Sequence, residues 1–214
     1  LGGVVVLLVI SPAAALANAL MVRVMDYNDI YWQQDPSHPS DIIPAAMACA
    51  ERSGKDGREL IVGIVLGHEF EMRFCEAAFP GIRERGWHHA TLTAFVSPIV
   101  AGRMLDLPSE KIQHAIGISA SHHCTLGAVT AGKLTMMKNT VDPMATQAGV
   151  FAALLAERGY TGPEHVIDGK EGLVKVLGPE WKLEVLTDGL GDSWRIQRCG
   201  MKAFPTEALT HAPI

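Results

Sequence analysis

The stretch Arg58-Glu-Leu-Ile-Val-Gly-Ile-Val-Leu-Gly-His-Glu-Phe-Glu-Met-Arg-Phe74 decides the fold class of this chain. Its apolar residues recur at the spacing that places side chains on one face of a helix. The pattern continues as far as Phe79-Pro80. We therefore expect a long amphipathic helix that packs against other helices.

Helical periodicity also dominates the sequence on both sides of this stretch. Helices are predicted for residues 13–25, 40–54, 91–105, 108–118 and 143–159. The second of these begins at Ser40, which is the expected N-cap, and Gly54 ends it. Close packing between helices is indicated by interior glycines, each of which costs about 1 kcal/mol against alanine: Gly63, Gly67, Gly117 and Gly149.

Strand-like alternation is confined to the end of the chain, where residues 181–186 and 194–199 are predicted strands. No internal repeat or low-complexity linker is present. The sequence therefore predicts an all-α domain over residues 1–180. Residues 181–214 are expected to form the beginning of a small α/β domain.

Composition excludes several classes of protein. Of the 214 residues, 48% are hydrophobic and 19% are charged, which provides for a large core. The net charge of −5 and the lack of any Lys/Arg run argue against a nucleic-acid surface. An anionic ligand must therefore be held by a few local cations. The four dispersed cysteines fit reduced thiols, as in the cytoplasm or a mitochondrial matrix.

The apolar residues 4–17 admit two interpretations. Val4 to Ile10, followed by Ala15-Leu16-Ala17, imitates a secretory leader with its cleavage site. No basic residue precedes this run, however, and Ser11-Pro12 interrupts a possible membrane span. We expect a buried core segment and no membrane anchor. From its two ends we also expect the chain to be a fragment.

Titratable groups concentrate between residues 26 and 41. Asp26 and Asp29 lie shortly before His38, and a buried aspartate can fix the tautomer of an imidazole. His38 precedes Pro39, and Ser40 begins a helix whose free N–H groups can receive an anion. Taken singly, the acids are explained better by helix capping, and His38 is explained equally well by a turn.

Three later positions carry groups suited to chemistry. His88 follows Trp87 on a predicted loop, where burial lowers the pKa of an imidazole and suits it to acid–base work. Lys138 and Lys202 lie among apolar residues, as a carboxylate anchor does, although surface exposure is the alternative for both. Because no HExxH or similar spacing occurs, we expect no metal site. Nucleotide and nucleophilic-serine motifs are also lacking.

A series of short motifs, in the same order along almost the whole chain, resembles the MmgE/PrpD family. The motifs are Ala15-Leu-Ala-Asn18-Ala, Met25-Asp-Tyr-Asn-Asp29, Ser37-His-Pro-Ser-Asp41, Arg85-Gly-Trp-His88, Lys138-Asn139, Ala152-Ala-Leu-Leu-Ala-Glu-Arg-Gly-Tyr-Thr-Gly-Pro163 and Lys202-Ala-Phe-Pro-Thr-Glu207. The family contains 2-methylcitrate dehydratase, cis-aconitate decarboxylase and iminodisuccinate epimerase.

The resemblance implies a large helical domain, a smaller α/β domain, a homodimer, and a cofactor-free site between the domains. It also implies the active-site residues, which by position are Asp26, His38, His88, Lys138 and Lys202. Ile30 stands where many members have threonine. Glu207 stands where the decarboxylase is expected to have histidine, which favours the dehydratase pattern.

We therefore expect a cofactor-independent lyase that removes water from 2-methylcitrate or a similar hydroxy-polycarboxylate. His38 or His88 would take a proton, Asp26 would orient His38, and Lys138 would bind and stabilise charge. Lys202, Ser40 and Glu207 complete the expected substrate contacts. The alternatives are decarboxylation of cis-aconitate and a catalytically silent helical interaction module.

Overall fold

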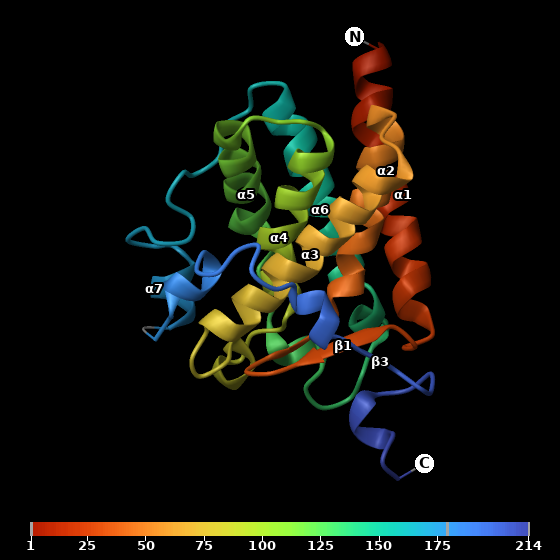
Figure 1. The fold of residues 1–214 in the computed structure, drawn as a ribbon, viewed down its shortest axis with the longest axis vertical. Coiled ribbons are helices and arrows are strands. Elements are labelled where there is room, and N and C mark those ends of the chain that lie inside the picture. Colours follow the sequence, from red (N-terminus) through yellow and green to blue (C-terminus); the bar gives the residue numbers. More distant parts are fainter. Residues whose placement is uncertain (1, 179, 214) are drawn as a thin grey trace.

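The computed structural model describes residues 2–178 and 180–213, and the chain is mostly helical (Figure 1). The α-helices are α1 (Gly2–Val24), α2 (Ile43–Ser53), α3 (Gly57–Ala77), α4 (Ala90–Met104), α5 (Ser109–His123), α6 (Val141–Glu157) and α7 (Leu173–Leu177). Short 3-10 helices occupy Pro39–Ile42, Ile82–Arg85, Gly127–Val129, Met136–Asn139, Leu183–Leu186, Arg195–Arg198 and Ala208–Thr210.

The helical core is built around α4 and α6. Helix α4 is buried along nearly its whole length, and it packs against α3, α5 and α6, while α1 covers α6 and α2. A Cβ atom at Gly149 of α6 would lie 2.5 Å from the side chain of Ser97 in α4. The close helix packing predicted from the interior glycines is therefore confirmed here.

Helix α3, from which the fold class is predicted, ends at Ala77, two residues before the predicted Phe79-Pro80. The carboxylate of Asp56 caps its first turn by accepting a hydrogen bond from the Glu59 amide at 2.9 Å. The preceding helix α2 ends at Gly54, which has the left-handed conformation that glycine adopts easily. Ser40 is not the N-cap of α2, because it lies within the preceding 3-10 helix and Ile42 occupies the cap position.

Helix α1 runs without interruption through Ser11-Pro12, contrary to expectation. Ser11, Ala15 and Ala19 are buried, as predicted for a core segment, whereas Ile10 is exposed. Among the side chains of α1, the structure describes those from Ile10 onward. Within the described part of the chain, no helix combines the length and apolarity needed to cross a membrane.

The sheet does not lie where the alternating pattern predicts strands. Its order is β2 (Pro36–Ser37), β1 (Asp29–Trp32), β3 (Gly200–Met201), with antiparallel pairs Tyr31 with Ser37 and Asp29 with Met201. The N- and C-termini lie at opposite ends of the long axis, with the sheet nearer the C-terminus (Figure 1).

The predicted strands 181–186 and 194–199 contain 3-10 helices instead. Side chains of α3 replace the strand partners. Arg73 donates to the carbonyl oxygens of Val185 and Asp188, at 2.6 and 2.8 Å. The backbone N–H of Arg195 donates to the Glu69 carboxylate at 2.8 Å. These contacts bind both segments along α3, and the β-pairing of residues 181–186 is limited to a single antiparallel bridge between Trp181 and Ala78.

Candidate active site

A cavity of about 710 Å³ lies beside the sheet, between β1, the loop before α4 and the segment before α6. Its lining gathers basic, acidic and imidazole side chains from well-separated parts of the sequence. Among them are Arg23, Asp26, His38, Arg83, His88, His89, Lys138, Lys202 and Glu207. The structure therefore brings together all but one of the predicted site residues, the exception being Ser40.

Asp26 holds the two predicted lysines at one wall of the cavity. It lies in the turn after α1, and its carboxylate accepts hydrogen bonds from Lys138 Nζ at 2.7 Å and from Lys202 Nζ at 2.5 Å. Burial tends to raise the pKa of Asp26, but the two ammonium groups outweigh it and hold the pKa well below its usual range. Two cations against one anion leave this wall positively charged.

His38 is oriented by Asp29 and not by Asp26, which corrects the predicted role of Asp26. The backbone carbonyl oxygen of Asp29 lies 2.6 Å from Nδ1 of His38 and accepts a hydrogen bond from it. Nε2 is thereby the nitrogen without a proton in the neutral ring. Burial, and then the positive charge of Arg23, lower the pKa of His38 to about 3. The ring is therefore a proton acceptor at neutral pH.

Ser40 serves the interior and not the cavity. Its hydroxyl donates to Asp29 Oδ1 at 2.5 Å, and its backbone N–H donates to the same carboxylate at 3.1 Å. Asn28 contacts the hydroxyl from the other side at 3.4 Å. Ser40 therefore holds the Asp29 carboxylate in position.

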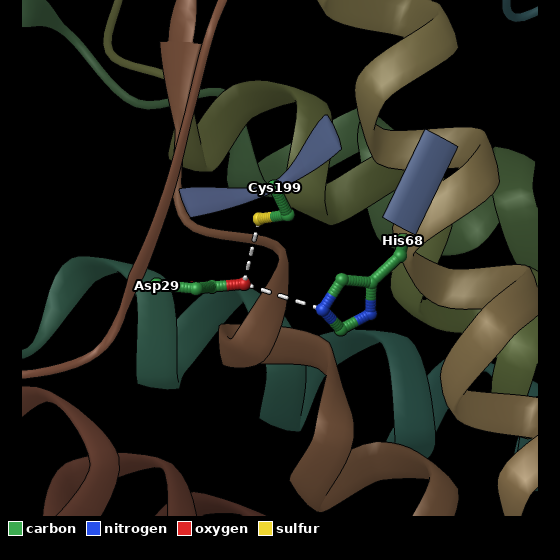
Figure 2. A group of neighbouring side chains, drawn as sticks. All are labelled: Asp29, His68 and Cys199. Atoms are coloured by element: carbon green, nitrogen blue, oxygen red, sulfur yellow. Dashed lines mark hydrogen bonds and ion pairs between the residues drawn. The ribbon is translucent and has the colours of Figure 1, made fainter. Parts of the chain in front are cut away.

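Asp29 is the centre of a cluster with His68, which is buried, and Cys199, which is half-buried (Figure 2). Its Oδ2 atom lies 3.2 Å from His68 Nε2 and 3.4 Å from Cys199 Sγ. Burial would raise the pKa of Asp29, but His68 and Ser40 outweigh it and lower the pKa. Burial, and then the negative charge of Asp29, raise the pKa of the Cys199 thiol.

His88 and His89 come from the loop that leads into α4. His88 is buried, and its Nδ1 accepts a hydrogen bond from the Ala90 amide at 3.2 Å. Burial, and then the neighbouring His89, lower the pKa of His88 to about 3. His88 is therefore a second neutral imidazole, as its predicted acid–base role requires.

Behind these rings lies a buried charged group of Arg23, Asp41 and Asp142. Arg23 Nη2 lies 3.2 Å from Asp142, and Nη1 lies 3.5 Å from Asp41. Burial tends to raise the pKa of Asp142, but His89 and Arg23 outweigh it and lower the pKa. Burial raises the pKa of Asp41 well above its usual range. Asp142 is therefore the charged partner of Arg23.

Two clusters in the described part of the chain combine donor atoms of the kinds that bind transition metals. They are Asp29, His68 and Cys199, and His88, His89 and Asp142. In the first cluster, Ser40 and Cys199 donate hydrogen bonds to the carboxylate and His68 pairs with it. Protein groups thus satisfy that carboxylate.

The sequence interpretation did not single out Arg23, His89 and Asp142. Arg23 is the only charged residue among the first 25, and a lone cation in an apolar helix is a signal of a buried pair. Asp142 directly precedes Pro143, where capping of a helix explains an acid equally well. His89 was hidden by its neighbour, because adjacent histidines in a loop give no indication of which ring faces inward.

Residues 9–186 match the MmgE/PrpD N-terminal domain. The cis-aconitate decarboxylase of Aspergillus terreus is 26% identical over 94% of this chain and 44% of its own length. The human cis-aconitate decarboxylase is 28% identical over 92% of this chain and 42% of its own length. The 2-methylcitrate dehydratase of Escherichia coli O157:H7 is 27% identical over 70% of this chain and 33% of its own length.

The chain thus spans less than half the length of the curated relatives that it matches. The domain match covers most of the chain, and it includes the helical core together with the cavity residues from Arg23 to Lys138. The chain belongs to the MmgE/PrpD family.

Proposed function

We propose that the complete protein is a cofactor-independent lyase that dehydrates 2-methylcitrate or a similar hydroxy-polycarboxylate. The main observation that supports this proposal is a cavity whose lining includes both ammonium groups and neutral imidazoles. Its volume of about 710 Å³ suits a small-molecule ligand. Proton transfer and charge stabilisation by these side chains supply what the elimination requires.

Lys138 and Lys202 are the proposed carboxylate anchors. Each ammonium has three N–H donors. Lys138 gives one to Asp26, and Lys202 gives one to the Asp26 carboxylate and another to the Asp26 carbonyl oxygen at 3.2 Å. The donors that remain can bind carboxylates of the substrate and stabilise the enolate-like charge that forms in the transition state.

His38 and His88 are the proposed proton acceptors. Both have a pKa of about 3, so each is a neutral base at physiological pH. One of them removes the proton next to a substrate carboxylate, and the electron pair of that C–H bond forms the double bond as hydroxide leaves. Acid–base assistance of this kind contributes about 10²–10⁴-fold in rate.

Decarboxylation of cis-aconitate is the second candidate. It is favoured by the relatives, since the decarboxylases of Aspergillus terreus and human match over 92–94% of this chain. The E. coli dehydratase matches over 70%. Glu207 lines the cavity at the position where the resemblance expects a histidine in a decarboxylase, which supports dehydration.

The test uses the complete protein, because the family resemblance implies that a second domain closes the site. We would incubate it with 2-methylcitrate and with cis-aconitate, and follow water loss and CO₂ release separately. Water loss from 2-methylcitrate supports the proposal, and CO₂ release alone supports the second candidate. If neither acid turned over, the protein would be an epimerase, a lyase for another acid, or a silent helical module.

The proposal also covers the oligomeric state and the cellular compartment of the protein. We propose a homodimer, in the cytoplasm or a mitochondrial matrix, in which residues 181–214 begin the smaller domain. Light scattering coupled to gel filtration of the complete protein measures the oligomeric state. A monomeric mass would contradict this part of the proposal.

A further inference from the structure

His89 and Asp142 form a pair at the cavity wall that has no assigned role in the proposed reaction. His89 Nε2 lies 3.1 Å from Asp142 Oδ1, and His89 lines the cavity while Asp142 is fully buried. We propose that His89, held and charged by Asp142, is the general acid that protonates the departing hydroxyl group. This inference rests on the proposed dehydration.

The surroundings of Asp142 keep it negative and therefore able to support a charged imidazole. Arg23 contacts its other oxygen at 3.2 Å, and the opposing carboxyl, Asp41, has a pKa raised by burial. The pKa of Asp142 itself is lowered, because His89 and Arg23 together outweigh the effect of burial. A buried carboxylate in ion-pair contact with an imidazole favours the protonated form of that ring.

The two neighbouring histidines differ from His89 in this respect. The ring of His38 lies 5.3 Å and the ring of His88 lies 4.0 Å from that of His89, measured between centroids. Burial is the main cause that lowers the pKa of both rings to about 3, and Arg23 and His89 lower it further. The cluster thus places one carboxylate-paired ring between two neutral ones.

The other polar groups of the cavity are less suited to donate this proton. Lys138 and Lys202 are engaged by Asp26. Glu207 is exposed and accepts a hydrogen bond from the Leu209 amide. The remaining charged or titratable groups near His89 are Arg23, Asp35, Asp41, His38 and His88.

The step balances without any further reactant. A neutral imidazole, His38 or His88, takes the proton from carbon, the C–H electron pair becomes the double bond, and the C–O bond breaks. The oxygen leaves with the proton of His89, and water is released. One ring has gained a proton and His89 has lost one, so proton exchange within the cluster or with solvent restores the starting state.

The test compares leaving groups in the complete enzyme. For His89→Gln, we expect turnover of the hydroxy acid to fall about 10²-fold or more. With the analogue that carries fluoride in place of the hydroxyl, the loss should be under about 10-fold, because fluoride departs with less need of a proton. His165→Gln is the matched control, since His165 is exposed and outside the cavity lining.

A second measurement does not depend on activity. Nitrogen NMR of the histidine rings at pH 7 should show two ring N–H groups in His89 and one each in His38 and His88. Asp142→Asn should remove the second proton of His89, and it should shift the alkaline limb of the pH–rate profile to lower pH.

The outcomes separate the two proposals. A wild-type enzyme that releases no water from any hydroxy acid overturns the proposed function. An active wild type whose His89→Gln variant loses equally on both leaving groups, or loses nothing, overturns the inference alone. A His89 ring with a single N–H at pH 7 overturns it as well.

Discussion

Asp26 and Asp29 stand three residues apart, yet the fold gives them opposite surroundings. Asp26 faces the cavity and is paired with two lysines. Asp29 is 3% exposed and contacts Ser40, His68 and Cys199, two of which are shown with it in Figure 2. Asp26 positions Lys138 and Lys202, which can contact a ligand. Asp29 positions the backbone segment that carries His38.

The backbone causes this difference. Asp26 ends the turn after α1 with a positive φ of 49°, a conformation that aspartate tolerates better than most residues. Asp29 begins β1, where its carbonyl oxygen reaches His38 and its side chain points into the interior. Residue type and spacing alone therefore do not separate a site carboxylate from a structural one.

The largest expected effect is on stability, and it separates the two aspartates directly. Asp29→Ala should lower the free energy of unfolding by about 3–5 kcal/mol, because it leaves buried partners of a charge unpaired. Asp26→Ala should lower it less, by about 1–3 kcal/mol, because Lys138 is partly exposed and the buried Lys202 keeps the Asp26 carbonyl oxygen as a partner. Urea unfolding of the two variants measures both values. Equal losses of unfolding free energy in the two variants would contradict the proposed difference between Asp26 and Asp29.

Loss of a cavity cation should affect turnover more than folding. Lys138→Met removes a proposed anchor and should reduce kcat/KM about 10²–10³-fold, comparable to removal of one donor from a charge-stabilising site. Steady-state kinetics on the acid that the wild type accepts would measure this. Lys133→Met is the matched control, because Lys133 is exposed in the same loop and outside the cavity lining. Similar kinetics for both variants would remove Lys138 from the site.

The neutral imidazoles should appear in the pH dependence of stability. The pKa of His88 is about 3 in the folded chain against an ordinary value of 6.5. Between these values the unfolded chain takes up a proton that the folded chain does not, so stability falls as pH falls from 6.5 toward 3.

Replacing this ring should remove that proton uptake. His88→Gln should make the decline shallower by about 1.4 kcal/mol per pH unit. Unfolding measured at several pH values tests this, with His165→Gln expected to leave the slope unchanged. A slope unaltered in His88→Gln would show that His88 titrates alike in both states.

The smallest expected effect is on thiol reactivity in the Asp29 cluster. Burial, and then the negative charge of Asp29, raise the pKa of Cys199, so its alkylation should be slow. Asp29→Asn should accelerate it about tenfold, which corresponds to one pKa unit. Mass spectrometry of alkylated peptides gives the rate, and exposed Cys124 provides the internal reference. An unchanged rate would mean that burial alone protects Cys199.

Helices could be predicted because their signals are local. The apolar repeat of α3, its Asp56 cap and the left-handed Gly54 that ends α2 all act within a few turns. The strands were misplaced because their alternation competes with distant partners. Arg73 and Glu69 of α3 engage the backbone of the C-terminal segments, and no local pattern contains that information.

The sequence by itself determined the helical class and the motifs that resemble the MmgE/PrpD family, since these depend on residue type and order. Only the tertiary structure decided which groups meet. Asp26 finds its lysines 112 and 176 residues away, Ser40 turns inward, and His89 joins Asp142. Charge pairing depends on distances of a few ångströms, and those distances are set by how the helices pack.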